Sequence, residues 1–458
     1  MSGYLFSRSG QKVPRVRTKF RSIQTEIPCP GTETILARLD RAESRSMHGQ
    51  LPLVWSRAKD FNVFDAAENK WIDFTSTIFV TNIGHANPHL LESLKHALDQ
   101  DLLHTYAYVN EIRAQYYDRL MEFAPRHFGK AFLLSAGTEA TEAGLKLMRM
   151  EGQRVGKRRP GIVCIEGNWH GRTMGAQMMS GNPAQKQWIG YTDPNIHHIP
   201  FPYPWALEGR SGAEFFADGM KKLADSGVDP ERDICGFMLE TFQGWGAVFY
   251  PPDFVQAVER HCRATRSLLC FDEMQAGFGR TGKRFGYEHY GVEPDLICCG
   301  KGMGSGLPLS GVIGRGEIMD LPDVGNMSST HSANPLVCAA GLATIEEIER
   351  LDLVRETERK GTLLHGLLNQ LRETYPDRIS HILGKGLLAA VLFTKPDGTG
   401  VDTVFPSLVS ERAMQKGLLV VHTGRESIKI GPPLTISDEA LTEGVSVLAE
   451  CIAELART

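Results

Sequence analysis

Four short, continuous apolar runs in the middle of the chain constrain its fold most strongly. They are GIVCIEG from Gly161, CGFMLE from Cys235, SLLCFDE from Ser267 and DLICCG from Asp295. Helix-like or loop sequence separates each run from the next, and this alternation is typical of parallel strands that helices bury on both faces. We therefore predict an α/β fold with a central, mostly parallel sheet flanked by helices.

The remainder of the 458-residue chain divides around this sheet. Near the N-terminus, VFDAAENKWIDF predicts a hairpin, and NPHLLESLKHAL predicts a helix opened by Asn87 and Pro88. The C-terminal part instead begins with charged amphipathic helices and continues as a mixed α+β tail. We predict a large domain over residues 85–344 and a smaller α+β domain formed by residues 1–84, which include an N-terminal arm, and 345–458.

Composition argues against several classes of function. A net charge of −4 gives no general attraction to nucleic acid or to an anionic membrane, and no apolar run is long enough to span a bilayer. The nine cysteines are scattered without zinc-site spacing, which predicts a cytoplasmic protein with no metal site. Residues 1–21 contain six Lys or Arg and no acid, so they predict either an arm that caps a neighbouring subunit or, alternatively, a mitochondrial targeting segment.

The stretch LLCFDEMQAGFGRTGK resembles two phosphate-binding loops without satisfying either. A Walker loop needs Ser or Thr after its lysine, whereas Arg284 follows Lys283. A dinucleotide fingerprint needs its first glycine directly after a strand, whereas DEMQA separates the strand from Gly277. What remains is Asp272 at the carboxyl end of a buried strand, where α/β sheets place their ligands.

A lysine follows the next predicted strand. Lys301 comes two residues after the strand Asp295–Cys299 and lies between Gly300 and Gly302, which allow a ligand to approach closely. A desolvated lysine can form a Schiff base, although an arbitrary lysine is more often a solvated surface residue. Since an aspartate on an adjacent strand is the partner that a protonated pyridine nitrogen requires, Asp272 with Lys301 predicts a pyridoxal phosphate site.

Eight segments extend this pattern from about Val63 to Ile436. They are DFTSTIFVTNIGHANP, SAGTEATEAGLKLMR, GNWHGRT, LETFQGWGAV, FDEMQAGFGRTG, GKGMGSGLPLSGVI, STHSANPLVCAAGLA and KIGPPLTIS. In this order they resemble the class III (subgroup II, ω-type) pyridoxal phosphate-dependent aminotransferases of fold type I.

The resemblance implies a transaminase that moves an amino group from a donor to a keto or aldehyde acceptor by a ping-pong mechanism. It also implies a homodimer, or a higher oligomer, with active sites shared between subunits. Two alternatives use the same scaffold and the same cofactor residues: a racemase, epimerase or decarboxylating transaminase, and a non-catalytic regulatory protein.

The resemblance also implies roles for the residues at the cofactor ring. Lys301 would be the Schiff-base lysine and proton shuttle, and Asp272 would keep the pyridine nitrogen protonated. Gln275 would hydrogen-bond the ring oxygen, and Trp169 would stack on the ring where the family usually has Phe or Tyr. His170, the residue after Trp169, receives no catalytic role.

The phosphate would be held by a helix N-terminus and by a second subunit. Gly137 and Thr138 lie where a strand turns into a helix, so their backbone N–H groups are candidates, although Thr138 could instead be only a helix cap. Thr330 resembles the threonine that reaches the phosphate from the other subunit, and a monomer would then be inactive.

The substrate pocket departs from the family pattern. Glutamate-using members pair a glutamate in a QGEGG segment with an arginine just before PPL, whereas this chain has Trp245 and Lys429 at those positions. Lysine offers a point charge instead of a bidentate fork. Arg425 could supply a guanidinium from an unusual position, and Tyr106 lies where the family lines its substrate channel.

Overall fold

The computed structural model describes residues 4–47 and 49–457 and divides the chain into two compact units. Unit 1 comprises the chain up to Asn87, the short stretch Trp245–Ala247 and the chain from Arg355 onward. Unit 2 comprises Pro88–Gly244 and Val248–Val354. The domain boundaries predicted after residues 84 and 344 are not tested by this division and stay predictions.

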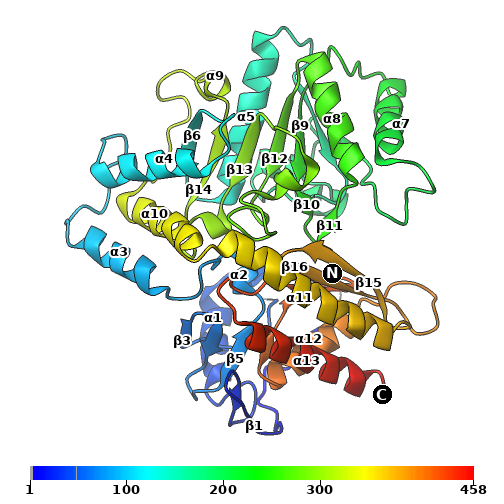
Figure 1. Ribbon diagram of the computed structural model, residues 1–458. Coiled ribbons are helices and arrows are strands. Elements are labelled where there is room, and N and C mark those ends of the chain that lie inside the picture. Colours follow the sequence, from blue (N-terminus) through cyan, green and yellow to red (C-terminus); the bar gives the residue numbers. More distant parts are fainter. Residues whose placement is uncertain (1–3, 48, 458) are drawn as a thin grey trace. The chain divides into compact units, whose positions relative to one another are not determined.

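Unit 2 is built on a seven-stranded sheet (Figure 1). In spatial order its strands are β6 (Lys130–Leu134), β14 (Ser310–Gly314), β13 (Leu296–Cys299), β12 (Leu268–Asp272), β9 (Ile234–Glu240), β7 (Gly161–Ile165) and β8 (Ile196–Ile199). The pairs from β13 to β8 are parallel, whereas β14 is antiparallel to both of its neighbours. The predicted mostly parallel sheet is confirmed.

The four apolar runs of the sequence form the centre of this sheet. They become β7, β9, β12 and β13, in which every residue is buried. Helix α5 (Gly137–Arg154) packs on β9, β13 and β14, whereas α8 (Pro252–Thr265) packs on β12 and against α7 (Gly212–Asp225). Strands covered in this way need apolar side chains on both faces, which explains why the runs are continuous.

The other helices of unit 2 frame the sheet. They are α3 (Pro88–Leu98), α4 (Glu111–Phe123), α6 (Met174–Met179), α9 (Gly316–Met319) and α10 (Pro335–Arg350), with 3₁₀ turns at Pro183–Ile189, Gly286–Tyr290 and Lys301–Met303. Both α3 and α10 begin with proline directly after asparagine, and the Asn334 side chain accepts a hydrogen bond from the Leu336 N–H at 2.9 Å. The helix predicted to open at Asn87 and Pro88 is thus confirmed.

Unit 1 contains two sheets. The first has the order β1 (Val16–Arg17), β2 (Ser22–Ile23), β5 (Lys70–Asp73), β4 (Asn62–Phe64) and β3 (Arg57–Lys59), with β17 (Leu418–Leu419) also paired to β5. The second has the order β15 (Ile379–Lys385), β16 (Leu388–Phe393), β19 (Ser427–Ile430) and β18 (Val421–His422). The antiparallel pair β4 and β5 is the predicted hairpin.

Helices α1 (Thr32–Ala42), α2 (Ser76–Phe79), α12 (Phe405–Gln415) and α13 (Asp438–Leu455) belong to unit 1, and α11 (Leu353–Thr374) starts at its boundary. The described part of the N-terminal arm contacts α12, because the Tyr4 hydroxyl and the Ser7 N–H both donate to the Glu411 carboxylate.

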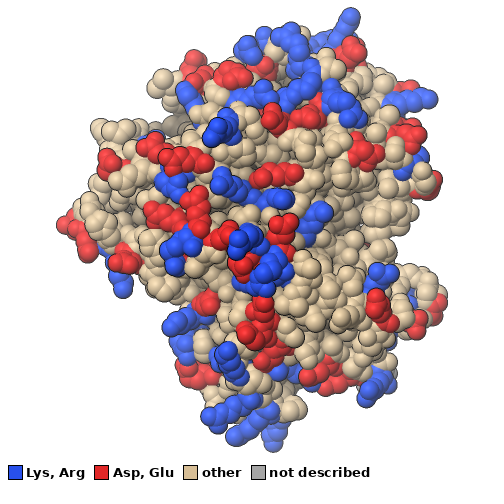
Figure 2. Space-filling model, viewed as in Figure 1, with Lys and Arg blue, Asp and Glu red and all other residues tan. Residues whose placement is uncertain are grey.

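On the face shown in Figure 2, neither sign of charge dominates. Figure 2 shows Lys and Arg interspersed with Asp and Glu over the face in view. Interspersed charges of this kind give that face no extended field that would attract a polyanion. Within the part of the chain that the structure describes, no helix combines the length and apolarity needed to cross a membrane.

Candidate active site

The register of the parallel strands brings three functional groups to one edge of the sheet. Strand β9 ends at Glu240 and β12 ends at Asp272, and these two residues are direct partners across the strands. On the other side, Asp272 is paired with Cys298 of β13, and Lys301 follows that strand at the start of a 3₁₀ turn. Asp272 therefore lies between Glu240 and the strand that leads to Lys301.

One cavity of about 210 Å³ opens at this edge, and six of the seven predicted cofactor residues line it. Its lining comprises Gly137, Thr138, Trp169, His170, Gly171, Glu240, Asp272, Met274, Gln275 and Lys301. The seventh predicted residue, Thr330, is exposed, and its carbonyl accepts a hydrogen bond from His104 Nε2 at 2.7 Å. Sequence reasoning gave no role to Gly171 or Met274, and none to His170.

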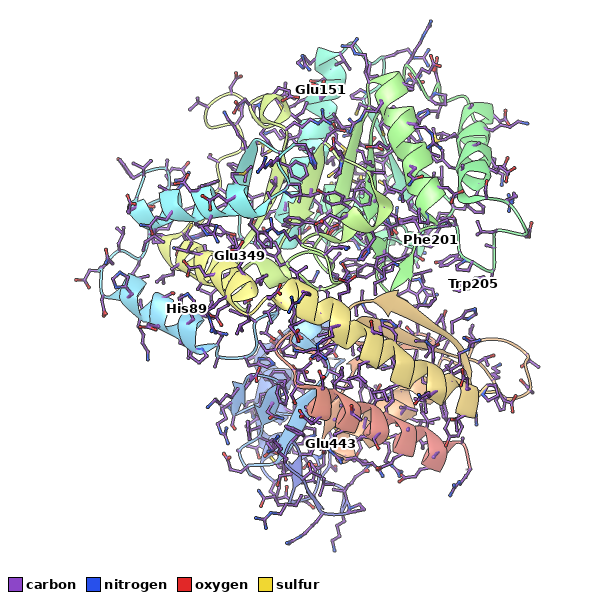
Figure 3. The ribbon with its side chains drawn as sticks, in the orientation of Figure 1. His89, Glu151, Phe201, Trp205, Glu349 and Glu443 are labelled. Atoms are coloured by element: carbon purple, nitrogen blue, oxygen red, sulfur yellow. The ribbon has the colours of Figure 1, made fainter. Side chains whose placement is uncertain are left out.

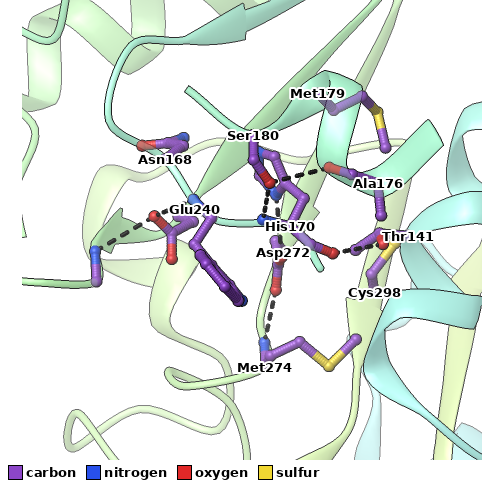
Figure 4. Close-up of polar contacts among 12 residues, drawn as sticks. Thr141, Asn168, His170, Ala176, Met179, Ser180, Glu240, Asp272, Met274 and Cys298 are labelled. Carbon is purple, nitrogen blue, oxygen red and sulfur yellow. Dashed lines mark hydrogen bonds and ion pairs between the residues drawn. The ribbon is translucent and has the colours of Figure 1, made fainter. Parts of the chain in front are cut away.

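His170 is the principal addition, because it binds the central carboxylate (Figure 4). Its Nδ1 lies 3.0 Å from Asp272 Oδ2, and both side chains are buried. The other carboxylate oxygen accepts the Met274 N–H at 3.1 Å. Beside an ionised aspartate, Nδ1 is the protonated nitrogen, so each oxygen of Asp272 has a fixed donor.

The backbone of His170 is held independently of its ring. Its N–H donates to Ser180 Oγ at 2.9 Å, and its carbonyl accepts the Thr141 hydroxyl at 2.7 Å (Figure 4). The ring nitrogen Nε2 is buried and has no hydrogen-bond partner among the described residues. The fold therefore positions the ring, and Nδ1 makes the ring's hydrogen bond to Asp272.

Lys301 has the environment of a nucleophile. It is partly buried, and desolvation lowers the pKa of its amine, whereas the carboxylates of Asp272 and Glu240 act in the opposite direction. A lowered pKa increases the fraction of neutral amine, which is the reactive form. The backbone of Lys301 is left-handed, with a φ of 45°, and such strain in a non-glycine residue is concentrated at functional sites.

Helix α5 presents an uncapped N-terminus to the cavity. Its N-cap is Ala136, which makes no side-chain cap, so the alternative that Thr138 is only a helix cap is wrong. Glu139 accepts the N–H groups of Ser135 and Ala136, each at 2.9 Å. The N–H groups of Gly137 and Thr138 follow in the first turn, which has no intrahelical acceptors for them, so this end of the helix suits an anion.

The hydroxyl of Thr138 is engaged elsewhere. It lies 2.7 Å from the hydroxyl of Thr173, which in turn donates to Glu142 Oε1 at 2.6 Å. Gly171 makes this packing possible, because a Cβ there would lie 2.2 Å from Thr138 Oγ1 and its φ is +136°. At this end of the helix, the backbone N–H groups are therefore more available to a ligand than the Thr138 hydroxyl is.

Glu240 joins the aromatic wall of the cavity to a neighbouring hairpin. Its Oε2 accepts the N–H of Trp169 at 3.1 Å and the N–H of Gly244 at 3.3 Å (Figure 4). The guanidinium of Arg172 lies 4.4 Å from the centroid of the Trp169 ring. A cation on the indole restricts the tilt of the ring that forms the wall.

The hairpin of β10 (Phe242–Gln243) and β11 (Val248–Phe249) is firmly anchored in unit 2. Gln243 donates to the Glu166 carbonyl at 2.6 Å and accepts the hydroxyl of Tyr203. Tyr203 stacks on Trp205 with centroids 4.9 Å apart and also contacts Phe201. Figure 3 labels Phe201 and Trp205. The tip of the hairpin, Trp245–Ala247, belongs to unit 1.

The residues predicted to bind substrate differ in their exposure and in their aromatic contacts. Within unit 1, the guanidinium of Arg425 lies 3.9 Å from the centroid of the Trp245 ring. Lys429 is buried, with its ammonium 4.5 Å from the ring centroid of Phe79. Tyr106, in unit 2, is exposed and does not line the cavity described above.

The cavity fits pyridoxal phosphate. The carboxylate of Asp272, with a donor on each oxygen, suits the protonated ring nitrogen of this cofactor. The desolvated amine of Lys301 suits its aldehyde. An indole suits the ring, and the first N–H groups of α5 suit a phosphate. Gly300 lets Met274, which also lines the cavity, pack against the turn before Lys301, because a Cβ there would lie 2.6 Å from Met274 Sδ.

Comparisons with known proteins agree with this chemistry. The model of the family "Aminotransferase class-III" matches residues 44–452. A 4-aminobutyrate aminotransferase of Mycobacterium leprae is 32% identical over 451 residues, which cover 95% of this chain and 98% of the relative. A leucine/methionine racemase of Thermococcus litoralis is 32% identical over 412 residues, with coverage of 88% and 91%. A solved (S)-enantioselective ω-transaminase of Thermomicrobium roseum superimposes with a TM-score of 0.83 at 26% identity, with coverage of 92% and 99%.

Proposed function

Because the chain belongs to the class III aminotransferases, which use pyridoxal 5′-phosphate to move an amino group from a donor to a carbonyl acceptor, we propose that Lys301 and Asp272 carry this reaction. The observation that supports the assignment is their meeting in one cavity with Trp169 and the N-terminus of α5. When bound, the cofactor supplies an electron sink for the charge that develops at the substrate carbon.

Lys301 has two tasks in this proposal. Its Nζ would hold the cofactor through the cofactor's aldehyde. As a neutral amine, the same Nζ would accept the proton from the substrate carbon that carries the amino group and later return a proton. Desolvation, which lowers the pKa of this amine, favours both tasks, because each requires the unprotonated form.

Asp272 would hold a proton at the ring nitrogen, and the hydrogen bond from His170 orients the Asp272 carboxylate. The N–H of His170 offsets part of the charge of this buried carboxylate through its hydrogen bond to Oδ2. Trp169 and Gln275 would position the ring, and the N–H groups of Gly137 and Thr138 would bind the phosphate.

A donor-only experiment tests the reaction. A transaminase given an amino donor without an acceptor accumulates the aminated cofactor and stops after one turnover of each site. A racemase, which the Thermococcus litoralis relative is named as, keeps turning over without accumulating it. Loss of the cofactor's aldehyde absorbance in proportion to the enzyme present is the expected result; sustained turnover of a single amino acid would contradict it.

We also propose a homodimer with shared active sites. Thr330 is exposed, and the segment before it, Met327–Ser329, lines a second cavity of about 480 Å³ along α5. His104 binds the Thr330 carbonyl and belongs to a loop whose later residues Tyr108 and Val109 are 81% and 88% exposed. Adjacent apolar surface of this kind is typical of an interface, and a second copy of the chain is the occupant that would bring Thr330 to a cofactor phosphate.

Complementation tests the shared site. Lys301→Ala and Thr330→Ala subunits, each inactive or weakly active alone, should regain activity when mixed, because one site of each mixed dimer then has both residues intact. Mixed dimers that are demonstrated by differential tags but show no regained activity would contradict the proposal.

The substrate class and location are proposed with different support. The 4-aminobutyrate relative and the exposed guanidinium of Arg425 support a donor or acceptor that carries a carboxylate.

A cytoplasmic location is supported by the cysteines, all nine of which are free thiols.

A further inference from the structure

Another cavity of unit 2, of about 240 Å³, opens at the amino-terminal ends of the strands, opposite to the cofactor site. Leu268, the first residue of β12, lines it, whereas Asp272 at the other end of the same strand lines the cofactor cavity. The rise along the strand separates these two residues by about 13 Å. The two cavities are therefore different sites, and the proposed reaction gives this one no role.

Four arginines line this cavity. They are Arg154 of α5, Arg263 of α8, Arg266 directly after α8 and Arg315 directly after β14. The side chain of Arg266 makes no hydrogen bond or ion pair with the residues that the structure describes. Desolvation lowers the pKa of the Lys157 amine, and the charge of Arg266 acts in the same direction. The cavity is therefore a region of positive potential.

Two buried carboxylates use only some of the guanidinium N–H groups. Glu151, which Figure 3 labels, accepts Arg154 Nε at 2.6 Å and one terminal nitrogen of the same side chain at 2.8 Å. Asp295 Oδ1 accepts Arg263 at 2.7 Å, and Arg315 Nε lies 3.0 Å from the same oxygen as an ion pair. The Arg315 side chain donates no hydrogen bond to the described residues. Its terminal N–H groups are therefore available to a ligand.

The ends of two helices meet at this cavity. A helix C-terminus ordinarily disfavours an anion, because its last carbonyl groups carry partial negative charge. At the end of α8, however, Lys157 Nζ donates to the Thr265 carbonyl at 2.6 Å, and the Arg266 N–H donates to the Cys262 carbonyl. At the end of α5, the Lys157 N–H donates to the Gly152 carbonyl at 2.8 Å. These carbonyls thus have donors other than the arginine side chains of the cavity.

The donor set suits a tetrahedral oxyanion. A carboxylate offers two acceptor oxygens, whereas a phosphate group offers at least three and accepts from several guanidinium groups at once. The lining contains four arginines and three carboxylates, of which the third is the exposed Glu317, so its net charge is positive. A phosphate group therefore matches both the number of donors and the sign of the charge.

We propose that this cavity binds a phosphate group, with Arg266 and Arg315 as its principal donors. The site is separate from the cofactor cavity, and the inference does not rest on the proposed function. Free inorganic phosphate and a small phosphomonoester share this chemistry. Since β12 and β13 run from this end of the sheet toward Asp272 and Lys301, a bound phosphate would stabilise the strands that carry the cofactor residues.

Equilibrium dialysis of the cofactor-loaded protein against labelled inorganic phosphate tests the proposal. At constant ionic strength we expect saturable uptake with unchanged cofactor absorbance. Arg266→Gln should weaken this binding about tenfold, because it removes a charge-assisted contact. Arg232→Gln is the matched control, because Arg232 is an exposed arginine that precedes β9 at the same end of the sheet and does not line the cavity. It should bind phosphate as the wild type does.

A second variant and two competitors sharpen the test. Arg315→Lys keeps the charge beside Asp295 but offers fewer donors, so it should also weaken binding; it decides the question if Arg266→Gln fails to fold. Unlabelled glycerol 3-phosphate and acetate then compete for the site. Displacement by glycerol 3-phosphate at lower concentration than by inorganic phosphate identifies a phosphomonoester as the better ligand, and the reverse order identifies free phosphate. Acetate should displace the label only at much higher concentration.

Four results would overturn the proposal. They are absence of saturable uptake, equal affinity of the wild type and Arg266→Gln, equal losses in Arg266→Gln and Arg232→Gln, and displacement by acetate as readily as by phosphate. Uptake that is accompanied by loss of cofactor absorbance would place the phosphate in the cofactor cavity and would contradict it as well. The donor-only experiment has no bearing on these measurements, so failure of the proposed function is distinguishable from failure of this one.

Discussion

Substitution of His170 by phenylalanine tests the arrangement on which the proposed chemistry depends. The change removes the Nδ1–H that lies 3.0 Å from Asp272 Oδ2 and leaves that buried carboxylate with the Met274 N–H as its remaining described donor. Since the backbone of residue 170 is held by Ser180 and Thr141, the ring of the new residue should occupy the same place.

The size of the effect follows from the loss of one hydrogen bond to a buried charged group, about 1.5–3 kcal/mol. The ionised form of Asp272 is destabilised by this amount, and its hold on the proton at the cofactor nitrogen weakens with it. We expect cofactor affinity to fall roughly tenfold to a hundredfold, with the larger loss at higher pH, where protonation of the ring nitrogen depends most on the carboxylate.

The assay is a titration of the apoprotein with pyridoxal phosphate, followed by absorbance at several pH values. His170→Gln, which keeps an N–H donor on a side chain of similar reach, should recover part of the affinity. Thr141→Val is the matched control, because it removes the bond to the His170 carbonyl but leaves the ring on Asp272. The double variant His170→Phe/Asp272→Asn should lose less cofactor-binding free energy than the sum of the two single variants, because both substitutions act on one interaction.

Two results would refute the reasoning. One is wild-type cofactor affinity in His170→Phe across the pH range. The other is strict additivity in the double variant together with equal losses in Thr141→Val, which would mean that His170 only fills space.

Three further predictions concern other parts of unit 2. Lys301→Ala should bind pyridoxal phosphate, seen by fluorescence quenching, yet lose multiple turnover; normal kcat would remove Lys301 from its role. Burial raises the pKa of Glu273 from 4.5 to about 7. Between these two pH values the folded state binds more protons than the unfolded state. The free energy of unfolding therefore falls by about 3 kcal/mol as the pH rises through this window. Glu273→Gln should flatten the Tm–pH curve in that window, and an unchanged curve would contradict the assignment. Gly171→Ala should lower cofactor affinity and Tm, because its Cβ would clash with Thr138 at 2.2 Å, whereas Gly190→Ala, also at positive φ but with nothing within 4 Å, should lower Tm alone.

The sequence by itself determined the central sheet and most of the predicted cofactor residues that line the cavity. Strands that are buried on both faces require continuous apolar runs. The sequence alone therefore identifies β7, β9, β12 and β13. In parallel strands the carboxyl ends share one edge, so a residue such as Asp272 at the end of its run could be placed near Lys301 without coordinates. Local motifs likewise showed the N-terminus of α5.

Only the tertiary structure decided which side chains meet across long separations in the chain. His170 and Asp272 are 102 residues apart, and nothing in GNWHGRT specifies which acid faces the histidine. The same holds for Arg425 and Trp245, which come from different hairpins and meet face to face. A hydrogen bond or a stacked pair forms only within a few ångströms and a narrow range of angles, and these are set by strand register and turn geometry. Sequence spacing carries no such information between distant segments, whereas the packed fold does.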